Sequence, residues 1–573
     1  MSPRLRLLLL ALTLPCLAAG NVYDFFMPHY HSGCSKGCAA WSSIPKAASL
    51  FTGGAVPPEA GSTCAMPSVS AGAHECDCAE KNATNYTEDS YAGPWCYCQE
   101  GGTAYCTPAN STVEQLNLQL AAATTVVAAF ITYEELPHSP AIAMFGTSPD
   151  DMKTIEGASH KYSPPNRTYI MHYVPFRNLK PRETYYYKVK SASEACAWTP
   201  TYSFRAPYSD GVTKIATYGD MGHSLYNNMQ NLKTDCESGA IDAIVHMGDH
   251  AYDMGFSTDR RGDAYMNVFQ PVLQGCPWMP IIGNHEAADG DHYKRYEQIA
   301  AGEIIGDGSI GTSSTADTAL GNHLSLGRLY GSGTHGTVPS NTSRYTSTDI
   351  GLIHIAGIDL MNFDEKQIAW LEADLAAAQT NRKNVPWVMV SAHFQVYHST
   401  VFENWNASAE AFFSEAAENW KQDHRFEPCS SINCQTLGEW HTAITNRLEP
   451  ILLKYGVDIY NAGHIHDYES SWPMKKGKVC QKSYTNPRCP VYIVEGNGGV
   501  PGAPADCKIS SCQNMFPWCR MHGNECGAYG RITISDSRTL HYEHVVNSNG
   551  KVLDSFTLIQ DDHGPFQDEL EYI

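Results

Sequence analysis

Four apolar runs after residue 211 end in a glycine followed by an aspartate, an asparagine or a histidine. They read VTKIATYGD, IDAIVHMGD, PWMPIIGN and GVDIYNAGH, and LIHIAGID, PWVMVSAH and CPVYIVEGN are similar runs. Between them lie stretches such as residues 364–381, DEKQIAWLEADLAAAQTN, with apolar residues at helical spacing and acidic residues in the first turn. This alternation predicts an α/β region, in which polar residues at strand ends are the usual place for a site.

The whole chain of 573 residues is too long for one ordinary core and predicts two to four domains. Residues 109–208 carry short alternating runs separated by Pro, Asn and Ser, which predict an antiparallel β-sandwich. We therefore expect a signal peptide at 1–20, a Cys-rich module at 21–108, the sandwich at 109–208 and a catalytic domain at 209–573 that includes the C-terminal strands. Residues 287–350 and 399–440 carry fewer signals and are interpreted as long insertions.

The N-terminal segment predicts export. MSPRLRLLLLALTLPCLAAG has an arginine-bearing start, an apolar run and small residues at its end, and it is too short to span a membrane. Twenty cysteines suit an oxidising compartment, and the eight at 34–106 read as a disulfide-stapled module, with a zinc module as the rival reading. Six N-x-S/T sequons are potential glycan acceptors: Asn82, Asn85, Asn110, Asn166, Asn341 and Asn406. We expect a secreted, glycosylated protein without a membrane span.

The net charge of −21 argues against nucleic-acid binding, because a protein that binds the phosphate backbone concentrates positive charge on its surface. The sequence does not indicate an oligomeric state.

Polar residues gather where the predicted strands end. The candidate ligands at these ends are Asp220, Asp249, Tyr252, Asn284, His393, His464 and His466. A single Asp or Asn here can be a turn former or a helix cap, and His464 and His466 alone could be two turn residues. As a set, the hard oxygens and borderline imidazoles suit Fe, Mn or Zn. Two ions about 3.5 to 4 Å apart could then clamp the attacking and leaving oxygens of an in-line displacement.

Five motifs carry a family resemblance. GDMG, GDHAY, GNHE, VSAH and GHIH resemble, in order, the five blocks of the purple acid phosphatases, a branch of the binuclear metallophosphoesterases. The resemblance covers roughly residues 109–560 and fits the plant- and fungal-like high-molecular-weight type. Most relatives in the wider superfamily have a histidine where Gly222 stands and an aspartate where Tyr252 stands, so these two positions are typical of the purple branch. LKPRETYYYKVKS resembles a stretch of fibronectin type III-like modules.

The resemblance implies a fold and a metal centre. The fold is an α/β metallophosphoesterase sandwich preceded by an all-β fibronectin type III-like domain and a disulfide-rich N-terminal module. Fe(III) is implied at Asp220, Asp249, Tyr252 and His466, and Asp249 bridges to a divalent ion (Zn, Mn or Fe) held by Asn284, His393 and His464. Phosphate monoesters are the implied substrates of a metal-dependent acid phosphatase that uses metal-bound hydroxide.

Two further histidines are candidate catalytic residues. His285, beside Asn284, is the first candidate to contact phosphate or protonate the leaving group, and His398 is its rival. Two other functions stay open. One is cleavage of phosphodiesters or nucleotide pyrophosphates at the same site. The other is a catalytically silent surface or matrix protein that binds through its Cys-rich module.

Overall fold

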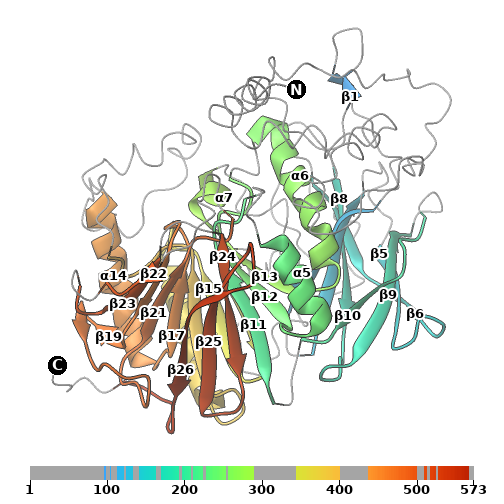
Figure 1. Ribbon diagram of the computed structural model, residues 1–573. Helices are drawn as coiled ribbons and strands as arrows, with labels where there is room; N and C mark the ends of the chain where they lie inside the picture. The colour runs from blue at the N-terminus through green and yellow to red at the C-terminus, as the bar shows by residue number, and fades with distance from the viewer. Residues whose placement is uncertain are drawn as a thin grey trace, which may run out of the picture.

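The protein is described by a computed structural model (Figure 1). The described residues are 96–97, 103–104, 113–121, 124–132, 141–162, 169–192, 197–207, 211–222, 228–252, 256–288, 344–399, 437–499, 509–512, 516–523 and 527–566. The predicted signal peptide and all six sequons lie outside these residues. So does the Cys-rich module, except for an antiparallel pair of two-residue strands, β1 (Cys96–Tyr97) and β2 (Thr103–Ala104).

The first domain is all-β and consists of two antiparallel four-stranded layers. One layer has the order β3-β4-β8-β7 and the other β10-β9-β5-β6. The strands are β3 (Glu114–Leu120), β4 (Val126–Thr132), β5 (Ala141–Gly146), β6 (Lys153–Glu156), β7 (Ala158–Tyr162), β8 (Tyr169–Phe176), β9 (Thr184–Ser191) and β10 (Tyr202–Arg205). Phe130, Phe176 and Tyr187 are among the residues buried in its core. The assignment to the fibronectin type III group stays a prediction.

The first layer continues into the second domain as one sheet of ten strands. A single parallel pairing, Trp278 with Gln119, joins β3 to β13, and the order beyond it is β13-β12-β11-β24-β25-β26. These strands are β11 (Thr213–Tyr218), β12 (Ala243–Met247), β13 (Trp278–Ile281), β24 (Ala528–Ile534), β25 (Thr539–Val546) and β26 (Val552–Ile559). Strands β11, β12 and β13 are parallel neighbours, so their carboxyl ends lie at one edge of the sheet.

A second sheet of eight strands has the order β14-β15-β16-β17-β21-β18-β23-β22. Its strands are β14 (Thr346–Ile350), β15 (Ile353–Ile358), β16 (Trp387–Ala392), β17 (Ile459–Ala462), β18 (Tyr468–Ser471), β21 (Val491–Glu495), β22 (Ile509–Ser510) and β23 (Cys519–Gly523). Strands β15, β16, β17 and β21 are parallel. A separate antiparallel pair, β19 (Met474–Lys475) and β20 (Lys478–Val479), follows β18.

The two sheets of the second domain pack face to face, with helices on their outer sides. Ile215, Val245 and Met389 belong to the core between the sheets, whereas the alternate residues Ala216 and Ile244 belong to the core on the helix side. The helices are α5 (Met229–Ser238), α6 (Phe256–Leu273), α7 (Asn284–Ala288), α10 (Glu365–Asn381) and α14 (Leu437–Lys454). Burial on both faces explains why these strands are apolar runs.

Helix α6 belongs to the second domain and packs against strand β3 of the first. In Figure 1, α6 runs beside the β-sandwich, and its Gln270 side chain accepts a hydrogen bond of 3.0 Å from the backbone of Leu116 in β3.

Helix α10 begins as its sequence predicts. The Asp364 side chain accepts a hydrogen bond of 2.8 Å from the Gln367 backbone N–H, as a helix cap does. None of the described helices combines the length and apolar character needed to cross a membrane.

Three disulfides fall within the described residues: Cys236–Cys276, Cys480–Cys489 and Cys512–Cys519. The first connects the C-terminal turn of α5 to the segment between α6 and β13. The third holds the start of β23, a strand that carries part of a side-chain cluster described below. These three disulfides brace segments outside the predicted Cys-rich module.

A buried carboxyl group between the two sheets makes stability depend on pH. Glu495, at the end of β21, is 0 % exposed and accepts hydrogen bonds from Thr217, Asn461 and Tyr542. Burial raises the pKa of Glu495 from 4.5 to about 7, and the three hydrogen bonds only partly offset this. The folded protein thus keeps a proton that the unfolded chain loses above about pH 4.5.

We expect this group alone to lower the free energy of unfolding by roughly 3 kcal/mol as pH rises from about 4.5 to about 7. The Glu495→Gln variant cannot ionise, so its stability should fall less with pH over this window. Denaturant midpoints at pH 5 and pH 7.5 measure the difference, with Glu156→Gln, at an exposed glutamate of β6, as the matched control. Parallel pH profiles for Glu495→Gln and the parent protein would refute this account.

Candidate metal centre

The seven predicted ligands lie at strand ends of both sheets. In the first sheet, Asp220 follows β11, Asp249 and Tyr252 follow β12, and Asn284 begins α7 just after β13. In the second sheet, His393 follows β16, and His464 and His466 lie between β17 and β18. Because β11, β12 and β13 are parallel neighbours, and so are β16 and β17, the carboxyl ends of the two sheets deliver these side chains to one place.

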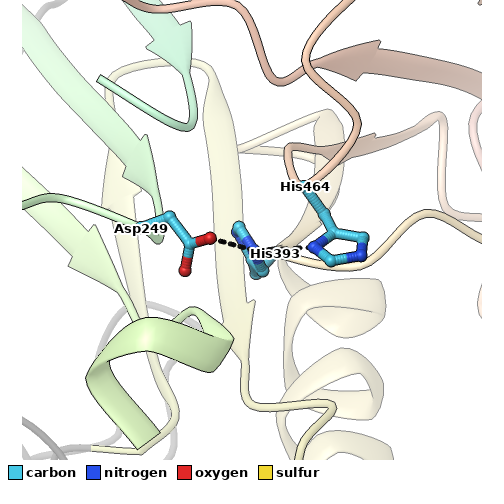
Figure 2. Close-up of side chains that lie close together, drawn as sticks. All are labelled: Asp249, His393 and His464. Carbon is cyan, nitrogen blue, oxygen red and sulfur yellow. Dashed lines mark hydrogen bonds and ion pairs between the residues drawn. The ribbon is translucent and has the colours of Figure 1, made fainter. Parts of the chain in front are cut away.

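Four of the residues form a first group around His393. One ligand atom from each of Asp249, His393 and His464 lies within 4.8 Å of the others. His393 Nε2 is 3.2 Å from Asp249 Oδ2, 3.2 Å from His464 Nδ1 and 2.9 Å from Asn284 Oδ1. Figure 2 shows Asp249 and His464 on opposite sides of His393, each from a different part of the chain. Carboxylate, amide and imidazole groups therefore meet here.

The other three residues form a second group around Tyr252. The Tyr252 hydroxyl is 3.3 Å from Asp220 Oδ1 and 3.0 Å from His466 Nε2, and His466 Nε2 is 3.3 Å from Asp220 Oδ1. The backbone N–H of His464 donates a hydrogen bond of 2.7 Å to Asp220 Oδ2, which connects the two groups. His464 and His466 thus belong to different groups although only one residue separates them.

Several residues at this site have a left-handed backbone conformation, which residues other than glycine rarely adopt. Asp220, Asp249, Tyr252 and His464 have φ angles of 59°, 51°, 54° and 70°. A left-handed backbone at such a residue costs of order 1 kcal/mol or more and persists only where the surroundings enforce it. Its recurrence at four of the seven predicted ligands is typical of a functional site.

Close packing is the main reason for the glycines that precede four of the ligands, which are Gly219, Gly248, Gly283 and Gly463. Of these four, Gly248 has a left-handed backbone, with a φ of 83°. A Cβ atom at Gly248 would lie 2.6 Å from the Gly283 backbone nitrogen, and one at Gly283 would lie 2.2 Å from Asp249 Oδ1. A larger residue at either position would therefore push the strand ends apart.

A buried carboxylate without an assigned role in the sequence analysis holds the first group in place. Glu286 is 1 % exposed and accepts backbone N–H bonds from Asp249 at 2.8 Å, His250 at 2.9 Å and Gly283 at 2.9 Å. It therefore joins the end of β12 to the end of β13. Its place in the GNHE motif was the only signal for it in the sequence.

Burial and mutual charge shift the pKa values of the side chains at this site. Burial raises the pKa of Asp220, and His393 and His466 only partly oppose it. For Asp249, burial is outweighed by His393 and His285, which hold its pKa below the usual value. Burial lowers the basicity of His393, but Asp249 and Asp220 raise its pKa to about 9. A cation that binds His393 must therefore displace a proton.

The two predicted catalytic histidines lie in different surroundings. The His285 side chain is 32 % exposed, its Nε2 lies 3.8 Å from Asp249 Oδ2, and its ring meets the Tyr252 ring edge-on at 4.8 Å. It therefore borders both groups of ligands. The His398 side chain is 1 % exposed, and its Nε2 lies 3.2 Å from Asp467 Oδ1, in a separate cluster. The His398 side chain is therefore buried beside Asp467 and does not border the two groups of ligands.

Family models match most of the described chain. Residues 113–206 match the purple acid phosphatase N-terminal domain, 213–468 match the calcineurin-like phosphoesterases, and 489–555 match the iron/zinc purple acid phosphatase-like protein C-terminal region. The chain belongs to the purple acid phosphatase family. The α/β metallophosphoesterase fold and an N-terminal all-β domain follow, as predicted, together with phosphoesterase chemistry as the activity of the family.

The chain is similar to proteins named as acid phosphatases from animals and as purple acid phosphatases from plants. The chain is 27 % identical to acid phosphatase type 7 of Mus musculus over 69 % of this chain and 78 % of the relative. It is 23 % identical to probable inactive purple acid phosphatase 1 of Arabidopsis thaliana over 68 % of this chain and 58 % of that one. The structure of a purple acid phosphatase from yellow lupin (Lupinus luteus) seeds superimposes with a TM-score of 0.52 at 18 % identity, covering 79 % of this chain and 75 % of the lupin chain.

Proposed function

We propose that this protein hydrolyses phosphate monoesters at a binuclear metal centre. The observation that carries the proposal is the convergence of seven hard or borderline ligands from five strand ends. Four of these seven residues have a left-handed backbone. A structural role for each Asp or Asn alone, as a turn former or cap, does not explain why all seven side chains meet. The donor types fit Fe and a divalent ion such as Zn, Mn or Fe.

The two groups of side chains suggest which residues hold each ion. Asp220, Tyr252 and His466 would hold Fe(III), because a phenolate and a carboxylate are hard anionic ligands that favour a trivalent ion. Asn284, His393 and His464 would hold the divalent ion. Asp249 would serve both, since its buried carboxylate contacts His393 and lies close enough to Asp220 that it adds to burial in raising the pKa of that carboxyl.

When bound, the two ions supply an activated water molecule and neutralise charge on the phosphate group. The chain contributes orientation and proton transfer. Glu286 and the close packing of Gly248 against Gly283 fix Asp249, so that the ligand positions exist before substrate arrives. The His285 side chain is 32 % exposed and borders both groups of ligands, so we assign to it the proton donated to the leaving alkoxide.

His398 has a weaker claim to the proton-donor role. Its side chain is buried against Asp467, and we expect its replacement to change the rates with alkyl and aryl phosphates only slightly. Secretion also remains part of the proposal. It is supported by the three disulfides of the second domain, which suit an oxidising compartment.

A spectroscopic prediction tests the ligand assignment. A tyrosinate bound to Fe(III) gives a visible charge-transfer band, so the Tyr252→Phe variant should lose this band. Phenylalanine preserves the ring packing against His285 and removes only the hydroxyl. The measurement is the visible spectrum of both proteins at equal iron content. An unchanged spectrum would show that Tyr252 is not the chromophore.

The substrate class is tested with a matched panel of an aryl phosphate monoester, the corresponding diester and a nucleotide pyrophosphate. We expect the largest kcat/KM for the monoester, and a preference for the diester or pyrophosphate would replace the proposal with the second enzyme function. A third outcome is suggested by the Arabidopsis thaliana relative, which is named a probable inactive purple acid phosphatase. If the protein binds both metals and cleaves none of the three compounds, it is a catalytically silent member of the family.

A further inference from the structure

A second cluster of potential metal ligands lies apart from the seven residues above. Single ligand atoms of His398, Glu469 and His522 lie within 4.8 Å of one another. Asp467 lies between the two histidines, with its Oδ1 3.2 Å from His398 Nε2 and its Oδ2 2.8 Å from His522 Nε2. His398 Nε2 is 4.0 Å from Glu469 Oε2. We call these four residues the His398 cluster.

Strand pairing builds the His398 cluster from three segments distant in sequence. Glu469 in β18 and His522 in β23 are direct partners across an antiparallel pair, so their side chains leave the sheet on the same face. Asp467 precedes Glu469 by two residues, which favours the same face. Ser399, next to His398, donates backbone N–H bonds of 3.2 and 3.0 Å to the Glu469 carboxylate. The pairing of β18 with β23 and the hydrogen bonds from Ser399 therefore fix the positions of these side chains.

The chemistry of the His398 cluster fits a zinc ion. Two imidazoles and two carboxylates bind Zn²⁺ with bonds of about 2.0 to 2.2 Å, so ligand atoms in a tetrahedral shell lie about 3.3 to 3.5 Å apart. Three contacts in the cluster, of 2.8, 3.2 and 4.0 Å, lie around this spacing, and the two histidines contact different oxygens of Asp467. A divalent cation would also balance the two carboxylates. The contact between Ser399 and Glu469 orients a ligand, as partners behind metal ligands usually do.

Burial separates this cluster from an ordinary acidic surface. The side chains of His398, Asp467 and Glu469 are 1 %, 8 % and 3 % exposed. His522 is 30 % exposed, so a cation has a path from solvent. Four protein ligands complete a tetrahedral shell, which is typical of a structural zinc site, whereas catalytic zinc sites keep a position open.

We propose that His398, Asp467, Glu469 and His522 bind a structural zinc ion, separate from the binuclear centre. The ion fastens β23 and the segment after β16 to the loop between β17 and β18. That loop carries His464 and His466, and Asp467 directly follows His466. The site is therefore adjacent in sequence to two ligands of the proposed catalytic centre, and its existence does not depend on the proposed function.

The His522→Gln variant tests the proposal in the full-length protein. Glutamine can still donate a hydrogen bond to Asp467 but is a poor zinc ligand, so the variant separates a metal site from a hydrogen-bonded network. Each protein is incubated with Zn²⁺, gel-filtered and analysed for zinc and iron. His541→Gln, at a partly exposed histidine of β25 that bonds Thr557, is the matched control.

We expect His522→Gln to contain one zinc equivalent per chain less than the parent and His541→Gln, with iron content and the visible band unchanged. Equal zinc content in all three proteins would overturn the proposal and leave a hydrogen-bonded network. Joint loss of zinc and iron would also overturn it, because the histidine would then belong to the binuclear centre. If His522→Gln does not fold, His398→Gln is measured with the same expected and contradicting results.

Discussion

The Asp249→Asn variant is expected to lose at least about 10³-fold in kcat/KM for a phosphate monoester, which corresponds to about 4 kcal/mol of transition-state stabilisation. Asparagine keeps the shape of the side chain, and its Oδ1 can still accept the 3.1 Å hydrogen bond from the His285 backbone. The negative charge beside His393 disappears, however, and with it the carboxylate proposed to serve both ions. Metal content should therefore fall together with activity.

The measurements for this variant are kcat/KM and bound metal per chain. Asp242→Asn is the matched control, because Asp242 is also buried but pairs with Arg182 and Arg205 away from the strand-end ligands. We expect this control to lose stability and to keep its metal content. If Asp249→Asn retained both metals and the activity of the parent, Asp249 would not be a ligand.

The His285→Ala variant is expected to slow hydrolysis of an alkyl phosphate by about 10²- to 10⁴-fold, the usual contribution of a general acid. Hydrolysis of an activated aryl phosphate should slow far less, because its leaving group is a weak base that departs without a proton. Metal content should not change, since His285 borders the ligands without belonging to either group. The measurement is kcat for both substrates with the parent and the variant.

His398→Ala, measured beside it, distinguishes the two histidines. We expect small and equal changes for both substrates, because the His398 side chain is buried in a different cluster. Equal losses on both substrates for His285→Ala would indicate that this residue binds phosphate. A large loss confined to the alkyl phosphate for His398→Ala would transfer the acid role to His398.

The seven apolar runs seen in the sequence all form strands, from β11 through β21. These strands are buried on both faces, so every position favours an apolar residue and the run stands out in the sequence. Helix α10 was predictable for a related reason. Its apolar residues recur at helical spacing, and Asp364 and Glu365 mark its start.

Other strands carry no such signal. Strand β14 (Thr346–Ile350) reads TSTDI and lies at the edge of its sheet, inside a segment interpreted as an insertion, so that interpretation was wrong at this end. Strand β18 reads YESS although it is buried. Its polar side chains are satisfied by tertiary partners, such as the Tyr492 backbone N–H that bonds the Ser471 hydroxyl. Sequence patterns cannot show partners of this kind.

The candidate site was accessible from sequence because its residues follow recognisable strands. The division into two groups was not derivable from spacing, since His464 and His466 diverge through a left-handed backbone at His464. The His398 cluster was equally hidden. Its members come from the segment after β16, the start of β18 and strand β23, and only the pairing of β18 with β23 brings them together.

The most direct test of the central claim is phosphate release from an aryl phosphate monoester by the purified full-length protein at acidic pH. It is measured before metal removal, after chelation, and after restoration of iron with one divalent ion. We predict hydrolysis by the native protein, its loss on chelation, and its recovery only when both metals are returned. Hydrolysis that survives complete metal removal, or its absence from protein that contains both metals, would contradict the proposed binuclear phosphatase.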